Sequence, residues 1–170
     1  MIKKISLIGP ECTAKTTLAS ELARHFGTMW IPEYAREYIE NLDHKYTFQD
    51  VEHIAQKQLS QINSTYPQAN NWIFFDTDLI ITKVWFEVVF NNCPEWINEE
   101  IKKKHFALHL LCKPDIPWVA DKVRENGGKN REILYFRYLD ILQNYKLPYG
   151  IVEGEEKMRF SNAIVLLNNL

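Results

Sequence analysis

A glycine, a lysine and a threonine near the N-terminus have the spacing of a phosphate-binding loop. Gly9 and Lys15-Thr16 fit the pattern G-x-x-x-x-G-K-[ST], in which backbone N–H groups surround phosphates, the lysine reaches the β- and γ-phosphates and the hydroxyl binds Mg²⁺. An apolar run precedes the loop, and apolar residues recur at helical spacing over 18–26. The sequence therefore predicts a site for ATP. The predicted contacts with ATP are Gly9, Pro10, Glu11, Cys12, Thr13, Ala14, Lys15, Thr16 and Thr17.

Ala14 stands where the pattern has its second glycine. Glycine gives the loop backbone freedom and lets a phosphate approach closely, whereas the Cβ of alanine is tolerated at negative φ and strained at positive φ. Two outcomes follow: the loop has adapted to alanine and transfers phosphate, or it binds ATP with weakened transfer and acts as a switch.

Two aspartates follow the apolar run 72–75. A strand that ends in aspartate beside a phosphate loop is typical of a magnesium site, so we expect Asp76 to join Thr16 at Mg²⁺. Asp78 could hydrogen-bond a substrate hydroxyl, and the catalytic base remains open among Asp78, Asp76 and Glu33. Either aspartate could instead cap the helix that follows.

A second group of polar and aromatic side chains begins at Glu33. Glu33 and Arg36 are three residues apart at the start of an expected helix, and Tyr34 and Tyr38 are four apart. An acid, a guanidinium and aromatic rings suit the hydroxyls and the ring of a nucleoside. A capped amphipathic helix with a surface ion pair explains the segment equally well.

A third segment carries arginines separated by two glycines. Arg124 and Arg131 flank Gly127-Gly128 in the irregular stretch 121–130, and a lid over 113–131 could fold these cations over transferring phosphates. A solvated charged loop is the alternative.

Alternating strands and helices must position these residues. Strands are expected at 2–8, 29–31, 72–76, 107–112 and 149–152, and helices at 15–26, 33–40, 47–61, 79–90, 95–104, 131–144 and 155–169. This alternation predicts an α/β fold with a parallel sheet. Ligands of such sheets lie beyond the carboxyl ends of the strands, where the residues above occur.

Length and composition indicate one domain over residues 1–170. The formal charge of −2 gives no general attraction to nucleic acid or to anionic membranes. The three cysteines have neither a disulfide framework nor zinc-type spacing, and no apolar run reaches the length of a membrane span. We expect a cytoplasmic protein whose partner is a small-molecule substrate; the sequence does not predict its oligomeric state.

Four phrases together resemble the ribosylnicotinamide kinase domain of the bacterial regulator NadR and stand-alone NadR-like ATPases. They are the phosphate loop from Gly9, the phrase 30–38, the phrase 75–78, and 115–118 with the Val-Arg-Glu that follows. The resemblance covers nearly the whole chain. It implies a P-loop kinase-like three-layer sandwich, a five-stranded parallel sheet of order 2-3-1-4-5, ATP with Mg²⁺, and phosphorylation of the 5′-hydroxyl of nicotinamide riboside in NAD salvage.

The resemblance also implies roles for individual residues. Lys15 and Thr16 would serve the phosphates and the metal, Asp76 would stand at the metal, and Arg124 and Arg131 would belong to the lid. The nucleoside side would include Glu33, Tyr34, Arg36, Trp85 and Trp118. Trp85 has core packing as an alternative, since its helix is rich in valine, phenylalanine and isoleucine. A kinase of another nucleoside or small alcohol is the alternative activity.

Overall fold

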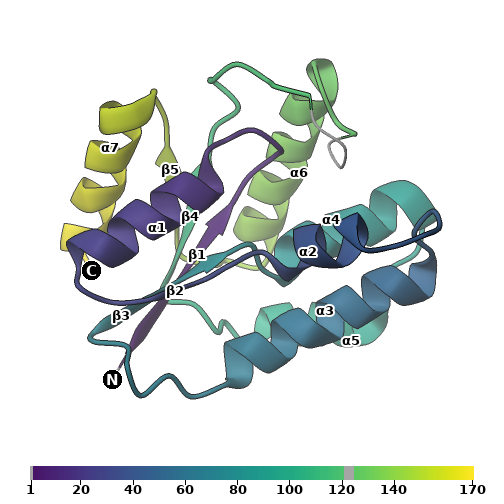
Figure 1. Ribbon diagram of the computed structural model, residues 1–170, viewed down its shortest axis with the longest axis horizontal. Coiled ribbons are helices and arrows are strands. Elements are labelled where there is room, and N and C mark those ends of the chain that lie inside the picture. Colours follow the sequence, from purple (N-terminus) through teal and green to yellow (C-terminus); the bar gives the residue numbers. More distant parts are fainter. Residues whose placement is uncertain (1, 121–124) are drawn as a thin grey trace.

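Five parallel strands form the centre of the protein, in the order β2-β3-β1-β4-β5 (Figure 1). The structure is a computed structural model, and it describes residues 2–120 and 125–170. The strands are β1 (Lys3–Ile8), β2 (Trp30–Ile31), β3 (Trp72–Asp76), β4 (Leu108–Cys112) and β5 (Tyr149–Val152). The parallel pairing and the strand order confirm the fold expected from the sequence.

Helices cover both faces of this sheet, which makes the three layers of a sandwich (Figure 1). α1 (Lys15–His25) and α7 (Glu156–Asn168) cover one face, where their apolar residues pack against β1, β4 and β5. The other face carries α3 (Phe48–Asn63), α4 (Leu79–Phe90), α5 (Glu95–Lys102) and α6 (Lys129–Asn144). The short α2 (Tyr34–Glu40) packs on α3.

Local sequence signals set several helix boundaries. Thr47 precedes α3 and accepts a hydrogen bond from the Asp50 N–H, while the Asp50 carboxylate accepts one from the Thr47 N–H at 2.8 Å. This reciprocal capping box starts the helix one residue after the predicted start. α4 has the predicted bounds, and among the described residues no helix is both long enough and apolar enough to span a bilayer.

Strand register brings the chemistry-bearing residues to one edge of the sheet. β1 pairs with β3 so that Leu7 lies beside Asp76, and with β4 so that Ile8 lies beside Leu111. The phosphate loop leaves β1 two residues after Leu7. Asp76 and the start of the 113–120 segment therefore flank the loop at the carboxyl edge.

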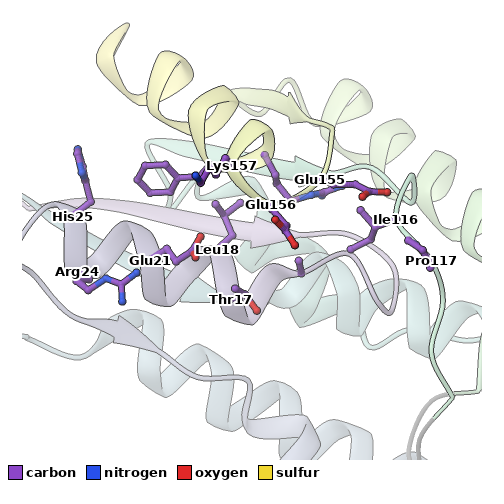
Figure 2. A pocket seen from close by; sticks show the side chains of 13 residues that line it. Thr17, Leu18, Glu21, Arg24, His25, Ile116, Pro117, Glu155, Glu156 and Lys157 are labelled. Atoms are coloured by element: carbon purple, nitrogen blue, oxygen red, sulfur yellow. The ribbon is translucent and has the colours of Figure 1, made fainter.

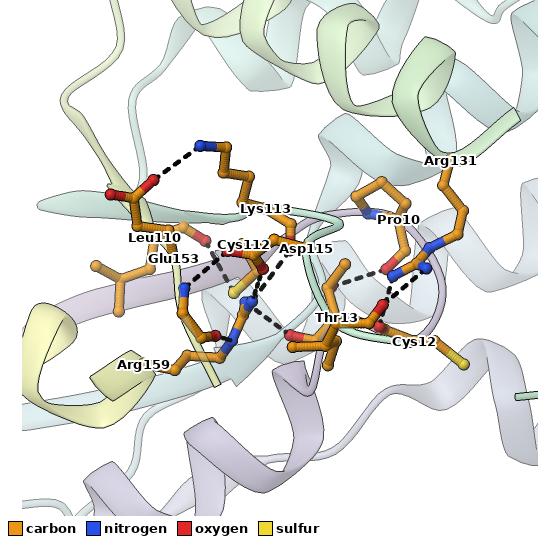
Figure 3. Close-up of polar contacts among 12 residues, drawn as sticks. Pro10, Cys12, Thr13, Leu110, Cys112, Lys113, Asp115, Arg131, Glu153 and Arg159 are labelled. Atoms are coloured by element: carbon orange, nitrogen blue, oxygen red, sulfur yellow. Dashed lines mark hydrogen bonds and ion pairs between the residues drawn. The ribbon is translucent and has the colours of Figure 1, made fainter. Parts of the chain in front are cut away.

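Arg159 on α7 joins the segments at this edge, a role that no local sequence pattern indicates. Its side chain is 2% exposed. It donates hydrogen bonds to the carbonyls of Gly154 (2.9 Å), Thr13 (3.1 Å) and Lys113 (3.1 Å), and it pairs with the carboxylate of Asp115 (Figure 3). One guanidinium therefore joins the phosphate loop to the ends of β4 and β5.

We expect Arg159→Met to lower the free energy of unfolding by about 3 kcal/mol, because it leaves a carboxylate and three carbonyls without their donor. In thermal denaturation followed by circular dichroism, the Tm should fall by roughly 6–12 °C for a chain of this size. Lys157→Met, on the exposed part of the same helix, is the matched control and should stay within about 0.5 kcal/mol of wild type. Equal Tm values for the two variants would contradict the bracing role.

Candidate active site

The phosphate loop runs from Gly9 at the end of β1 to the first turn of α1. Gly9 has φ of 152°, and a Cβ there would lie 2.6 Å from the carbonyl oxygen of Cys112, so only glycine fits. Lys15 opens α1, and its Nζ donates to the carbonyls of Gly9 and Pro10, each at 3.0 Å. A loop of backbone N–H groups with a lysine at a helix N-terminus is suited to binding phosphate.

Two loop residues without the freedom of glycine adopt left-handed backbone angles. Cys12 has φ of 52°, and Ala14, the N-cap of α1, has φ of 57°. Ala14 therefore occupies the strained conformation that glycine would adopt freely. The replacement of the second glycine by Ala14 therefore strains the backbone, and contacts around the loop must stabilise this conformation.

Two buried arginines hold the loop from opposite sides (Figure 3). Arg131, on α6, donates from Nη2 to the carbonyl of Cys12 (2.8 Å) and from Nη1 to that of Ile116 (2.9 Å). Arg159, on α7, donates to the next loop carbonyl, that of Thr13, at 3.1 Å. Consecutive carbonyls of the loop are thus fixed by side chains from two helices.

This arrangement corrects the role predicted for Arg131. We expected a mobile lid cation, but the side chain is 6% exposed and both of its terminal nitrogens bind backbone carbonyls. The residue is a brace between the phosphate loop and the chain after β4. The other predicted lid arginine, Arg124, lies outside the described residues, as does Lys122.

Glu11 connects the loop to the segment that precedes α6. Its carboxylate accepts hydrogen bonds from the backbone N–H groups of Glu125 (3.1 Å) and Asn126 (3.0 Å) and from the Asn126 side-chain amide (3.1 Å). Sequence reasoning placed Glu11 at the nucleotide through its position in the loop. The structure shows instead a carboxylate that binds the backbone of residues 125 and 126.

Asp76 and Thr16 meet beside Lys15. The Thr16 hydroxyl donates to Asp76 Oδ2 at 2.5 Å, and among the described residues Asp76 Oδ1 is buried without a hydrogen-bond partner. Burial raises the pKa of the Asp76 carboxyl above its ordinary value of 3.8, and the charge of Lys15 opposes that rise. A hydroxyl and a carboxylate with an unpaired oxygen are hard oxygen donors of the kind that Mg²⁺ prefers.

Asp78 does not join this group. Its carboxylate accepts from the Ser6 hydroxyl (2.6 Å) and from the Ile80 N–H (2.8 Å), and it lies 3.3 Å from Nε2 of His109. The side chain is 2% exposed and caps α4. The structure therefore shows the helix cap that the sequence also allowed for Asp78, and a catalytic or substrate-binding role stays a prediction.

Glu33 faces the phosphate loop from the N-terminus of α2. It lines a cavity of about 370 Å³ together with Lys15, Thr16 and Arg36. Burial raises the pKa of the Glu33 carboxyl, while the charge of Lys15 lowers it. A carboxylate with a raised pKa at the wall of a cavity is a candidate general base.

Apolar and aromatic side chains also line this cavity, which we call the α4–α6 cavity, and Tyr46 among them donates to the carboxylate of Glu125 at 3.0 Å. Trp85 lines it and meets Tyr46 edge to face, with ring centroids 5.0 Å apart. Sequence reasoning placed Trp85, Glu33 and Arg36 near a nucleoside, and all three line this cavity. The cavity also includes residues that it missed, because their shared feature is spatial: Ile39, Tyr46, Ile81, Val88, Val89, Asn126, Leu134 and Tyr138.

Tyr34 and Trp118 lie elsewhere, contrary to expectation. The Tyr34 hydroxyl is 3.1 Å from Nε2 of His53, so its ring packs between α2 and α3 with that of Tyr38. Trp118 packs against the backbone of Gly127, where an added Cβ would lie 3.2 Å from the indole. Neither side chain lines the α4–α6 cavity; α2 instead presents Ala35, Arg36 and Ile39 to it.

A second cavity, of about 790 Å³, lies between α1 and α7 (Figure 2). We call it the α1–α7 cavity. Ala14 and Thr17 line both cavities, so the two meet where the phosphate loop enters α1. The other lining residues are Leu18, Glu21, Arg24, His25, Ile116, Pro117, Glu155, Glu156, Lys157, Arg159 and Phe160.

A braced phosphate loop at the carboxyl edge of a 2-3-1-4-5 parallel sheet defines a P-loop nucleotide-binding protein of the kinase type. The family described as an AAA domain matches residues 4–159, and the chain belongs to this family. It is also similar to the trifunctional NAD biosynthesis/regulator protein NadR of Escherichia coli (strain K12), with 25% identity over 177 residues. That alignment covers 99% of this chain and 43% of NadR, so the chain spans less than half of that relative.

Solved structures agree on the fold. A crystal structure of NadR protein in complex with NR has a TM-score of 0.81 and 23% identity, covering 99% of this chain and 50% of that one. A deoxyadenosine kinase from M. mycoides has a TM-score of 0.64 and 18% identity, covering 98% of each chain. The resemblance to NadR and the kinase-type fold, both expected from the sequence, are confirmed.

We expect Ala14→Gly to stabilise the protein by about 1 kcal/mol, because relief of left-handed strain exceeds the added entropy of the unfolded chain. The Tm should rise by roughly 2–4 °C, with ATP affinity kept or improved in calorimetry. Ala19→Gly, in the middle of α1, is the control and should destabilise by about 1 kcal/mol. A lower Tm or a clear loss of ATP affinity in Ala14→Gly would show that the loop is adapted to alanine.

Asp76→Asn should make the ligand-free protein more stable at neutral pH. A carboxyl whose pKa is raised on folding binds its proton more tightly in the native state, so stability falls as the pH rises from the ordinary value through the raised one. The gain in Tm over wild type should shrink as the pH falls toward about 4. The same variant should reduce phosphoryl transfer roughly 100-fold. If the difference in Tm between Asp76→Asn and wild type does not change with pH, Asp76 is not a buried carboxylate that ionises with a raised pKa.

Proposed function

We propose that this protein is an ATP-dependent kinase that phosphorylates the 5′-hydroxyl of nicotinamide riboside. One observation supports this most directly: two cavities meet where the phosphate loop enters α1, and Ala14 and Thr17 line both. Phosphoryl transfer needs a donor and an acceptor that approach the same phosphate from opposite sides. A nucleotide in the α1–α7 cavity and a nucleoside in the α4–α6 cavity would meet that requirement.

The donor would be ATP with Mg²⁺. Lys15 and the loop N–H groups would bind the phosphates, and Thr16 with the unpaired oxygen of Asp76 would hold the metal. Bound Mg²⁺ supplies charge neutralisation of the transferring phosphoryl group. Ile116, Pro117 and Glu155 would surround the adenosine end of the nucleotide in the α1–α7 cavity.

The acceptor would lie in the α4–α6 cavity with its 5′-hydroxyl toward the loop. Glu33 is the proposed base, because it lines this cavity and its pKa is raised. Asp78 already accepts from Ser6 and the Ile80 N–H, and Asp76 would hold the metal. The ring of nicotinamide riboside is cationic, and Trp85 with Tyr46 offers aromatic faces to a cation. The NadR structure in complex with NR supports this substrate class.

A kinase of another nucleoside is the second candidate. The structural match to deoxyadenosine kinase covers 98% of this chain and 98% of that one. This match supports a nucleoside acceptor without specifying the base. The cysteines among the described residues are free, as is usual in a reducing compartment; we propose the cytoplasm as the site of action.

ADP formation with and without nicotinamide riboside tests the proposal. We expect a strong stimulation by the riboside, its loss in Lys15→Ala, and a fall in kcat of roughly 100-fold in Glu33→Gln. The wild-type rate should rise with pH through the raised pKa of Glu33, because only the ionised carboxylate accepts a proton, and Glu33→Gln should lose that rise.

Glu37→Gln, on the exposed part of the same helix, is the matched control and should keep wild-type kinetics. ATP hydrolysis that ignores every nucleoside would contradict the kinase and favour the ATP-binding switch. Stimulation by another nucleoside alone would favour the second candidate.

A further inference from the structure

Tyr138 on α6 has a hydroxyl that forms no hydrogen bond with residues 2–120 or 125–170. The side chain is 4% exposed and lines the α4–α6 cavity with Glu33 and Lys15. No other described residue donates to its phenolic oxygen or accepts from it. The hydroxyl is not one of the fully buried polar atoms of the described residues, although the rest of the side chain is buried. A phenol that opens on a cavity with no protein partner is free to hydrogen-bond a ligand there.

The surroundings of Tyr138 identify the end of the cavity that its hydroxyl serves. Burial and then the negative charges of Glu33, Glu11 and Asp78 raise its pKa, so the phenol keeps its proton and acts as a donor. Glu11 is not available to it, since that carboxylate already accepts from residues 125 and 126. The charged groups that act on the hydroxyl are those near the phosphate loop, and Glu33 and Glu11 line the same cavity as Tyr138.

A nucleoside in this cavity has only one way to place its parts. Its 5′-hydroxyl must reach the loop, and its base must take the apolar end beside Trp85 and Val88. The sugar then lies between them, and its secondary hydroxyls are the polar groups within its ring. We propose that Tyr138 donates a hydrogen bond to a secondary hydroxyl of the acceptor's ribose and so selects ribonucleosides over deoxyribonucleosides. This inference rests on the proposed function only in requiring a nucleoside acceptor.

The experiment compares Tyr138→Phe with wild type on matched substrates. The substrates are nicotinamide riboside and adenosine, each beside its 2′-deoxy and 3′-deoxy forms, with kcat/KM measured for all. A site built to bond a hydroxyl discriminates against the analogue that lacks it. For wild type, we expect kcat/KM to be about tenfold higher with the ribose substrate than with one of its two deoxy forms. In Tyr138→Phe, kcat/KM should fall for the ribose substrate and stay unchanged for that deoxy form.

Tyr135→Phe is the matched control. Tyr135 lies one turn earlier on α6 and is 6% exposed, but it lines neither cavity at the phosphate loop. This variant should keep the wild-type preference. Tyr138→Phe should also keep or raise the wild-type Tm, since it removes no hydrogen bond of the ligand-free protein; a merely structural role would lower the Tm and leave the preference intact.

Each outcome decides the inference. An unchanged preference in Tyr138→Phe, or an equal loss on ribose and deoxy forms, overturns it. If adenosine is phosphorylated and nicotinamide riboside is not, the proposal of nicotinamide riboside as the substrate is wrong. The ribose preference measured with adenosine and its deoxy forms then still tests the role of Tyr138. If nicotinamide riboside is phosphorylated with no dependence on Tyr138, only the inference fails. If neither nucleoside is phosphorylated, both fail.

Discussion

The site depends on two buried guanidinium groups that hold consecutive carbonyls of the phosphate loop. In a trans peptide the C=O and N–H point in opposite directions. When Arg131 holds the carbonyl of Cys12 and Arg159 holds that of Thr13, the N–H of each of these peptides points away from the arginine that holds its carbonyl. The left-handed angle of Ala14 persists within this frame. The two braces thus fix the orientation of two successive peptide planes of the loop.

The second constraint is an accumulation of negative charge around one lysine. Glu33 and Asp76 both have pKa values raised by burial, and the charge of Lys15 opposes the rise in each. Such a site is expensive in the ligand-free protein, since buried carboxylates lose solvation. Under the proposed function, the same arrangement would give Mg²⁺ its oxygen ligands and an acceptor hydroxyl its base. The carboxylates that lower the stability of the ligand-free protein are therefore the same ones that the proposed activity requires.

Much of the fold could be predicted from local patterns. The capping box at Thr47 and Asp50 marked the start of α3, and the spacing around Gly9 and Lys15 identified the loop, because these features depend on residues that are close in the chain. Asp76 lies beside Thr16, as expected, because the end of a parallel strand has a fixed position beside the loop; its role at Mg²⁺ stays a prediction. Tyr34 and Trp118 were assigned to the wrong surroundings, since residue type alone does not say which side of a helix or loop faces a cavity.

The sequence by itself determined the α/β class, the strand order implied by the resemblance, and the residues that could bind phosphate and metal. Only the tertiary structure decided that Asp78 caps α4, that Arg131 is a brace, and that Arg159 and Tyr138 have any part in the site. The physical reason is distance along the chain. A carboxylate or guanidinium acts through whichever groups lie within hydrogen-bonding reach, and Arg159 reaches Thr13 across 146 residues.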